Sequence, residues 1–341
     1  MRLRAADRRV AIIGDGAMGT VCAIMLAENG CSVRLWSAFP AAARRVAAAR
    51  ENRRFLPGAR LPDGVEVTGS DAEALADVGW AISAVPTQFM RGVWGRLAPH
   101  CPRGLAICSV AKGIENGTLL RPSQVLRDVL DGSPDAGRDV AVLSGPSIAP
   151  EVARHLPASV TVAATDPRFA QRVQRLLSRP YFRVYTNLDA VGVEVAGASK
   201  NVIAIAAGIL DGLCVGDNAK AALVTRGLAE ITRLGLAMGA GRDTFAGLAG
   251  VGDLITTCIS PVGRNRSFGE AIGRGKTVRG ALAATDSVVE GVATTRSVLE
   301  LSGRLGVEMP ITRAVHDVLF RGVAPRDAIH KLMSRPLKAE S

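Results

Sequence analysis

Short apolar runs alternate with helical stretches along the first half of the chain. The runs are rich in Val and Ile, and we expect strands at 10–14, 33–36, 65–68, 80–85, 105–110, 140–143 and 160–164. The stretches between them have helical character at 18–29, 41–50, 72–76 and 123–130. Strands that alternate with helices favour a mostly parallel sheet covered on both faces. The first half is therefore predicted to be a doubly wound α/β domain.

The strand pattern fades after about residue 187, and apolar positions then follow helical spacing. Residues 191–213 are long, Ala-rich and apolar, which predicts a buried helix. Further helices are expected at 219–238, 265–272, 294–305 and 313–319. We predict an α/β domain over residues 1–188 and an all-α domain over 189–341. No low-complexity linker separates the two, so they are expected to pack closely.

Composition narrows the possible partners. The 341 residues carry 42 Lys and Arg against 31 Asp and Glu, a net charge of +11, with only 4% aromatic residues. The basic residues are scattered and not interleaved with aromatics, so phosphorylated small ligands are favoured over nucleic acid, and no nucleic-acid partner is expected.

The cysteines and the N-terminal segment indicate the cellular compartment in which the protein is expected. The six cysteines include no Cys-x-x-Cys pair, which predicts neither a disulfide framework nor a metal site. The N-terminal apolar run is too short for a signal peptide, and we expect no run long enough to span a membrane. A cytoplasmic protein is the resulting expectation.

A glycine motif follows the first predicted strand. Gly14, Gly16 and Gly19, with Ala17 and Met18 between the last two, form G-x-G-x-x-G at the start of a helix. This strand–turn–helix context is typical of a Rossmann-type dinucleotide site, where backbone N–H groups hold the pyrophosphate. The alternative is a glycine-rich turn without a ligand.

The end of the second predicted strand does not decide between NAD and NADP. Residues 34–39 contain no carboxylate to bind a ribose 2′-hydroxyl and no arginine at the strand tip to attract a 2′-phosphate. The choice between NAD and NADP therefore stays open.

Polar residues interrupt apolar segments at several later points. Lys112 and the 144–147 segment follow predicted strands, at the edge where open α/β sheets bind ligands. Lys200 and Asn201 lie inside the apolar 191–213 helix, so Lys200 must be paired or reach solvent as a surface side chain. Asp253 stands among glycines and apolar residues.

A basic segment precedes the helix predicted at 265–272. Arg264 and Asn265 lie at its start and could clamp a phosphate, combining a guanidinium with helix N–H groups. A solvated basic turn is the alternative.

The ordered set of these motifs resembles the NAD(P)-dependent sn-glycerol-3-phosphate dehydrogenase family over residues 8–330. The segments that carry the resemblance are 14–19, 51–58, 109–113, 144–153, 200–201, 252–254, 264–265 and 289–291. The resemblance implies a Rossmann-type domain followed by a helical domain, with the site between them. It also implies reversible reduction of dihydroxyacetone phosphate to sn-glycerol 3-phosphate for glycerophospholipid synthesis, and by analogy a homodimer.

The resemblance also implies roles for individual residues. Lys200 is then the general acid and base, Lys112 polarises the carbonyl, and Asp253 orients the lysine and the glycerol hydroxyls. Substrate contacts would come from Lys112, Gly145, Ser147, Lys200, Asn201, Asp253, Gly263, Arg264 and Asn265. Cofactor contacts would come from Gly14, Gly16, Ala17, Met18, Gly19, Phe55, Lys112, Ala149, Arg264, Val288 and Glu290.

Three positions depart from the family's usual pattern. Met18 stands where an aromatic residue is frequent, and Ala38 or Phe39 where bacterial members often carry a basic one. Gly263 replaces a usual serine and so removes one hydroxyl from the phosphate clamp.

Two other functions compete with this one. A related dehydrogenase of a 3-hydroxy acid or ketopantoate would have to use Arg264 for a carboxylate. A dinucleotide-binding regulator associated with DNA would have little use for both Lys112 and Lys200, and the chain offers no basic helix-turn-helix.

Overall fold

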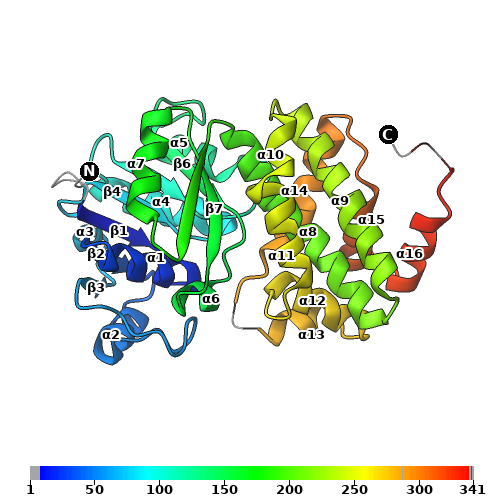
Figure 1. Ribbon diagram of the computed structural model, residues 1–341, viewed down its shortest axis with the longest axis horizontal. Helices are drawn as coiled ribbons and strands as arrows, with labels where there is room; N and C mark the ends of the chain where they lie inside the picture. The colour runs from blue at the N-terminus through cyan, green and yellow to red at the C-terminus, as the bar shows by residue number, and fades with distance from the viewer. Residues whose placement is uncertain (1–7, 286, 338, 340–341) are drawn as a thin grey trace.

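An eight-stranded sheet forms the centre of the N-terminal half in the computed structural model, which describes residues 8–285, 287–337 and 339 (Figure 1). Its strands lie in the order β3-β2-β1-β4-β5-β6-β7-β8. Pairing is parallel from β3 through β6, antiparallel between β6 and β7, and parallel again between β7 and β8. The strands are β1 (Arg9–Ile13), β2 (Ser32–Trp36), β3 (Val65–Thr68), β4 (Trp80–Ser83), β5 (Ala106–Ser109), β6 (Val140–Ser144), β7 (Ala158–Ala163) and β8 (Phe182–Asn187).

Helices cover both faces of this sheet. Along β1, Val10 and Ile12 pack in one apolar cluster with residues of α1, α6 and α7, whereas Ala11 and Ile13 pack in another with α3, α4 and α5. The period of two along the strand thus sorts side chains between two cores. The helices are α1 (Ala17–Glu28), α2 (Pro40–Ala49), α3 (Asp71–Leu75), α4 (Thr87–Leu97), α5 (Pro122–Asp131), α6 (Ala149–Ala153) and α7 (Pro167–Leu177).

The seven predicted strands are confirmed, and one strand was missed. In β8, Phe182 and Val184 are buried while Arg183 and Tyr185 are exposed, an alternation typical of a half-buried strand. The run carries only these two buried apolar positions and pairs on one side only, with β7, so its apolar pattern is weak.

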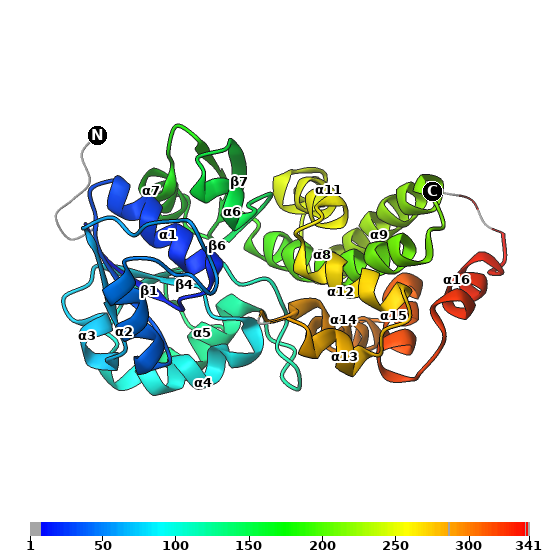
Figure 2. The same cartoon turned by 90° about the horizontal axis from the view of Figure 1, so that it is seen from below.

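The described residues of the C-terminal half form helices joined by loops, with no strand among them, as predicted. Its long α-helices are α8 (Ala190–Leu213), α9 (Asp217–Ala237), α12 (Arg264–Gly273), α14 (Glu290–Arg304), α15 (Pro310–Phe320) and α16 (Pro325–Met333). Shorter ones are α10 (Arg242–Ala246), α11 (Asp253–Ile259) and α13 (Val278–Ala283). In Figure 2, α8 lies among α9, α11, α12 and α14, and its residues 192–209 are all buried.

The expectation that no apolar run reaches the length of a membrane span was wrong. Helix α8 is long and apolar enough by length and composition, with a mean hydropathy of 1.5 over its most apolar window, yet 89% of that window is buried inside the protein. The apolar surface of α8 is explained by its central place, since a helix surrounded by other helices is apolar on every side. Among the described residues it is the one helix with this length and composition.

Candidate active site

The glycine loop joins β1 to α1 and leaves room beside one of its glycines. Gly14 has a φ of 110°, and a Cβ on Gly19 would lie 2.0 Å from the Gly14 carbonyl oxygen. The protein's own packing therefore requires both of these glycines. A Cβ on Gly16 would meet no atom within 4 Å, and no side chain caps the first N–H groups of α1. Open space beside uncapped helix N–H groups fits a bound pyrophosphate.

Asn52 holds this loop from outside. Its buried side-chain amide donates to the Asp15 carbonyl oxygen at 2.6 Å and to Thr20 Oγ1 at 2.8 Å, and its Oδ1 accepts from the Phe55 backbone N–H at 3.3 Å. Sequence reasoning did not single out Asn52, because nothing local in 51–58 shows that the segment reaches the loop.

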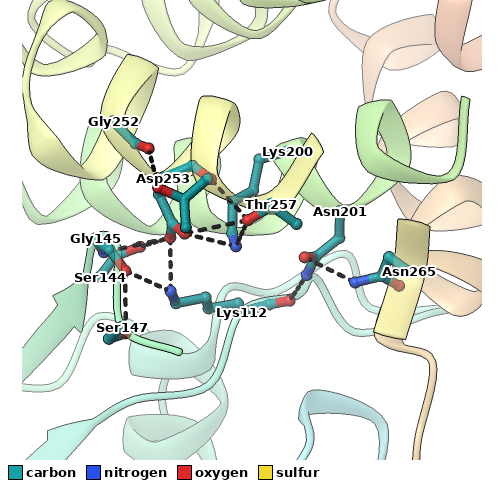
Figure 3. Close-up of polar contacts among 11 residues, drawn as sticks. Lys112, Ser144, Gly145, Ser147, Lys200, Asn201, Gly252, Asp253, Thr257 and Asn265 are labelled. Carbon is teal, nitrogen blue, oxygen red and sulfur yellow. Dashed lines mark hydrogen bonds and ion pairs between the residues drawn. The ribbon is translucent and has the colours of Figure 1, made fainter. Parts of the chain in front are cut away.

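A cluster of two lysines and one aspartate lies where the domains meet (Figure 3). Asp253 begins α11 and accepts Lys200 Nζ on Oδ1 at 2.8 Å and Lys112 Nζ on Oδ2 at 2.6 Å. Lys200 comes from α8, whereas Lys112 comes from the loop after β5. Lys200 is only 5% exposed and Asp253 2%, so Lys200 is a buried, paired lysine and not a surface side chain.

Burial and charge set the ionisation of this cluster. Burial lowers the pKa of Lys200 to about 8, because desolvation outweighs the attraction of Asp253, and Lys112 lowers it further. Burial by itself raises the pKa of Asp253, but the two ammonium groups outweigh that effect and hold its pKa below the usual value. The site thus combines an ionised carboxylate with an amine able to exchange its proton near neutral pH.

Further contacts fix the two lysines. Lys200 Nζ donates to Thr257 Oγ1 at 2.5 Å, and Thr257 Oγ1 donates to the Asp253 carbonyl oxygen at 2.6 Å. Lys112 Nζ also donates to the Gly145 carbonyl oxygen at 3.1 Å, which accepts from Ser147 Oγ at 3.0 Å. The lysine ammonium groups are therefore directed by neighbours from both domains.

A chain of amides connects this cluster to the start of α12. Asn201 Nδ2 donates to the Lys112 carbonyl oxygen, and Asn265 Nδ2 donates to Asn201 Oδ1, both at 2.9 Å. Asn265 Oδ1 in turn accepts from the Gly291 N–H at 3.0 Å. Both ends of the buried Asn265 amide thus contact protein, so this side chain fixes the position of α12.

The remaining candidates surround the cluster. Arg264 is exposed at the first turn of α12, whose N-terminal residue Gly263 supplies no side-chain cap. Glu290 begins α14 and accepts from the Thr87 backbone N–H, across the domain junction, at 3.2 Å. Burial raises the pKa of Glu290, and the charge of Arg264 opposes that rise. Ala149 is buried at the start of α6, and Val288 is exposed just before α14.

The residues that contact the lysine–aspartate cluster were not all among the sequence candidates. Thr257 lies one helical turn after Asp253, so its i+4 spacing could have placed it on the same face of a helix. Ser144 Oγ donates to Asp253 Oδ2 at 3.2 Å, a contact between segments 109 residues apart that no local pattern predicts. Within residues 8–285, 287–337 and 339, no group of three or more His, Cys, Asp or Glu side chains is placed to hold a metal ion.

Two family models match the chain. The N-terminal domain of NAD-dependent glycerol-3-phosphate dehydrogenase matches residues 9–170, and the C-terminal domain of the same enzyme matches residues 189–330.

Individual relatives agree with these models. A protein of Geobacter sp. named glycerol-3-phosphate dehydrogenase [NAD(P)+] is 47% identical over 97% of this chain and 98% of its own length. A protein of Mycobacterium bovis with that name, numbered 2, is 48% identical, again over 97% and 98%. The crystal structure of glycerol-3-phosphate dehydrogenase from Coxiella burnetii superimposes with a TM-score of 0.92 at 37% identity, covering 97% of this chain and 100% of that one.

A looser likeness extends to other dehydrogenases. A ketopantoate reductase from Ralstonia eutropha shares the fold at a TM-score of 0.60 and 16% identity. At that identity only the fold is shared. The two family models together with the long, 47–48% identical relatives show that this chain belongs to the NAD(P)-dependent glycerol-3-phosphate dehydrogenase family.

Proposed function

We propose that this chain interconverts dihydroxyacetone phosphate and sn-glycerol 3-phosphate at the junction of its two domains. Residues 1–188 would bind the dinucleotide, and residues 189–341 would supply most of the catalytic and phosphate-binding groups. The observation that carries the proposal is the convergence of Lys112 and Lys200, one from each domain, on the buried carboxylate of Asp253.

The two lysines would handle the charge at the reacting oxygen. When bound, the reduced nicotinamide supplies a hydride to C2 of the substrate. Lys200 would donate a proton to the C2 oxygen in reduction and remove it in oxidation, a role for which a pKa of about 8 is suited. Lys112 would stabilise negative charge on the same oxygen. Asp253 would keep both ammonium groups directed toward the C2 oxygen of the substrate.

The start of α12 would hold the substrate phosphate. Arg264 supplies an exposed guanidinium there, next to helix N–H groups that no side chain caps. Gly263 would let the phosphate approach the backbone, and Asn265 would fix the helix through its bonds to Asn201 and Gly291. Phosphate held there positions the carbonyl at the lysines.

The other candidate residues keep the roles that the family resemblance implies. On the dinucleotide side the proposal keeps Gly14, Gly16, Ala17, Met18, Gly19, Phe55, Lys112, Ala149, Arg264, Val288 and Glu290. On the substrate side it keeps Gly145 and Ser147, which contact the Lys112 ammonium or its acceptor.

The metabolic use of the product, the cellular compartment and the oligomeric state are inferred by analogy with the family. sn-Glycerol 3-phosphate would feed glycerophospholipid synthesis in the cytoplasm, and the enzyme would be a homodimer. Light scattering of the purified protein tests the dimer: a mass of one chain would contradict it.

The reaction is tested by absorbance of the reduced nicotinamide, with purified protein and dihydroxyacetone phosphate, using NADH and NADPH in parallel. Consumption of either cofactor is expected, and the ratio of the two efficiencies gives the preference that residues 37–39 leave open. Cofactor binding without consumption would contradict the proposal and favour a hydroxy-acid substrate, which the same assay with ketopantoate would detect.

A further inference from the structure

The two carboxylate oxygens of Asp253 have different partners. Oδ1 accepts from Lys200 Nζ at 2.8 Å and lies 3.3 Å from Thr257 Oγ1, and both of these residues belong to the helical domain. Oδ2 accepts from Lys112 Nζ, from Ser144 Oγ at 3.2 Å and from the Gly145 N–H at 3.3 Å, all in the dinucleotide domain (Figure 3). The side chain of Asp253 thus bridges the domains with one oxygen turned toward each.

Of the donors to Oδ2, Ser144 is the one not yet given a role. It ends β6, is 3% exposed, and its hydroxyl is directed at Asp253. It is buried, and its hydroxyl forms a hydrogen bond with Asp253 and with neither lysine ammonium. Its hydroxyl can therefore affect catalysis only through Asp253.

Helix α8 leaves space for this hydroxyl at a glycine. Gly197 lies three residues before Lys200 on α8, and a Cβ placed on it would lie 2.8 Å from Ser144 Oγ and 3.6 Å from Lys112 Cγ. Any side chain at position 197 would push against the serine hydroxyl. The close approach of β6 to α8 therefore depends on Gly197.

We propose that Ser144, accommodated by Gly197, is a positioning residue that fixes the rotation of the Asp253 carboxylate so that it pairs with Lys112 and Lys200 at once. This inference rests on the proposed function, since it assigns a role within that reaction. A carboxylate free to rotate could direct both oxygens toward one lysine and release the other. The serine hydroxyl and the Gly145 N–H hold Oδ2 on the side of the dinucleotide domain.

Loss of the hydroxyl has a second consequence for the proton-transferring lysine. A donor to Oδ2 withdraws part of the carboxylate's negative charge, so its removal leaves Asp253 a stronger partner for the ammonium groups. The titratable groups facing this carboxylate are Lys112 and Lys200. Cys258 also responds to the charge of Asp253, whereas Glu290 responds to the charges of the two lysines. The Lys200 ammonium is then stabilised and gives up its proton at higher pH.

The test is steady-state reduction of dihydroxyacetone phosphate as a function of pH, for the wild type and Ser144→Ala. We expect kcat to fall about tenfold, as for the loss of one charge-assisted hydrogen bond, with KM changed by less than about threefold. The alkaline limb of the kcat profile should move to higher pH. Ser302→Ala removes another buried serine hydroxyl, which donates to the Leu299 carbonyl oxygen within α14, and should change neither quantity.

Three further variants separate positioning from general packing. Gly197→Ala should reproduce the Ser144→Ala kinetics with the serine present, and the double variant should be no slower than either single one. Ser144→Cys keeps the branching of the side chain with a slightly larger atom and a weak donor, so it gives the same readout if the alanine variant fails to fold.

The outcomes are distinct. An inactive wild type would refute the proposed function itself. An active wild type with unchanged kcat and pH limb in folded Ser144→Ala or Ser144→Cys would overturn the role of Ser144 alone. Additive losses in the double variant would also overturn it, because Gly197 and Ser144 would then act separately.

Discussion

The glycine loop and the lysine–aspartate cluster offer two different kinds of charged site. The loop uses backbone N–H groups at one helix start, and its central glycine faces open space. The cluster uses side chains from the β5 loop, β6, α8 and α11, and its charges already contact one another. The charged groups of the loop are fixed by a local turn, whereas those of the cluster are fixed by the packing of distant segments, including segments from both domains.

This difference explains why the two sites respond differently to substitution. A backbone site is sensitive to added atoms, since a new Cβ can occupy the ligand's place or clash with the loop. A side-chain site is sensitive to lost charge, because each group depends on the others for its ionisation state. Variants that add atoms to the loop or remove charge from the cluster therefore test the comparison directly.

The largest effect is expected for Lys200→Ala. Removal of the proposed general acid and base should lower kcat by about 10²–10⁴-fold, while NADH binding to the glycine loop stays close to wild type. Stopped-flow or steady-state turnover, with fluorescence titration of NADH, gives both values. Lys331→Ala, an exposed lysine on α16, is the control. Wild-type turnover in Lys200→Ala would remove Lys200 from the chemistry.

A smaller effect is expected at the start of α12. Arg264→Ala should raise KM for dihydroxyacetone phosphate by about 10–100-fold, the range for a charge-assisted contact with phosphate. Arg274, which pairs with Glu270 just beyond the last turn of the same helix, is the matched control as Arg274→Ala. If Arg264→Ala impairs unphosphorylated dihydroxyacetone equally, Arg264 does not act on the phosphate.

The smallest effect on activity is expected in the glycine loop, where alanine substitutions at Gly16 and Gly19 should have different consequences. Gly16→Ala adds a methyl group where the protein leaves space, so we expect unchanged thermal stability and roughly tenfold weaker NADH binding. Gly19→Ala places its Cβ 2.0 Å from the Gly14 carbonyl oxygen and should lower Tm as well. Thermal unfolding followed by circular dichroism, with NADH titration, distinguishes the two. A drop in Tm for Gly16→Ala would show that position 16 serves packing.

The fold was largely predictable because its elements are locally encoded. Seven strands follow from apolar runs, and the loop follows from glycines at fixed spacing next to one of them. Strand β8 has only two buried apolar positions and was missed. Helix α8 was predicted as a long, buried helix over 191–213, and the structure adds that 89% of its most apolar window is covered by the rest of the protein.

The cluster was less predictable, because its members are far apart in the chain. Lys200 stood out as a charge within an apolar helix, and its expected role rests on the family resemblance. The contacts of Ser144 and Asn52 depend on how distant segments pack, so the sequence gives no local sign of them. Thr257 is intermediate in predictability, because its i+4 spacing from Asp253 places the two residues on one helix face once α11 is recognised.

The central claim is that Lys200 exchanges the proton at the reacting oxygen, and the pH dependence of kcat in both directions tests it most directly. Burial lowers the pKa of Lys200 to about 8, so the protonated form needed for reduction predominates below that pH and is lost above it. Reduction should therefore slow as pH rises through about 8, while oxidation of glycerol 3-phosphate should accelerate over the same interval. Profiles that are flat there, or that change in the same direction for both reactions, would contradict the account.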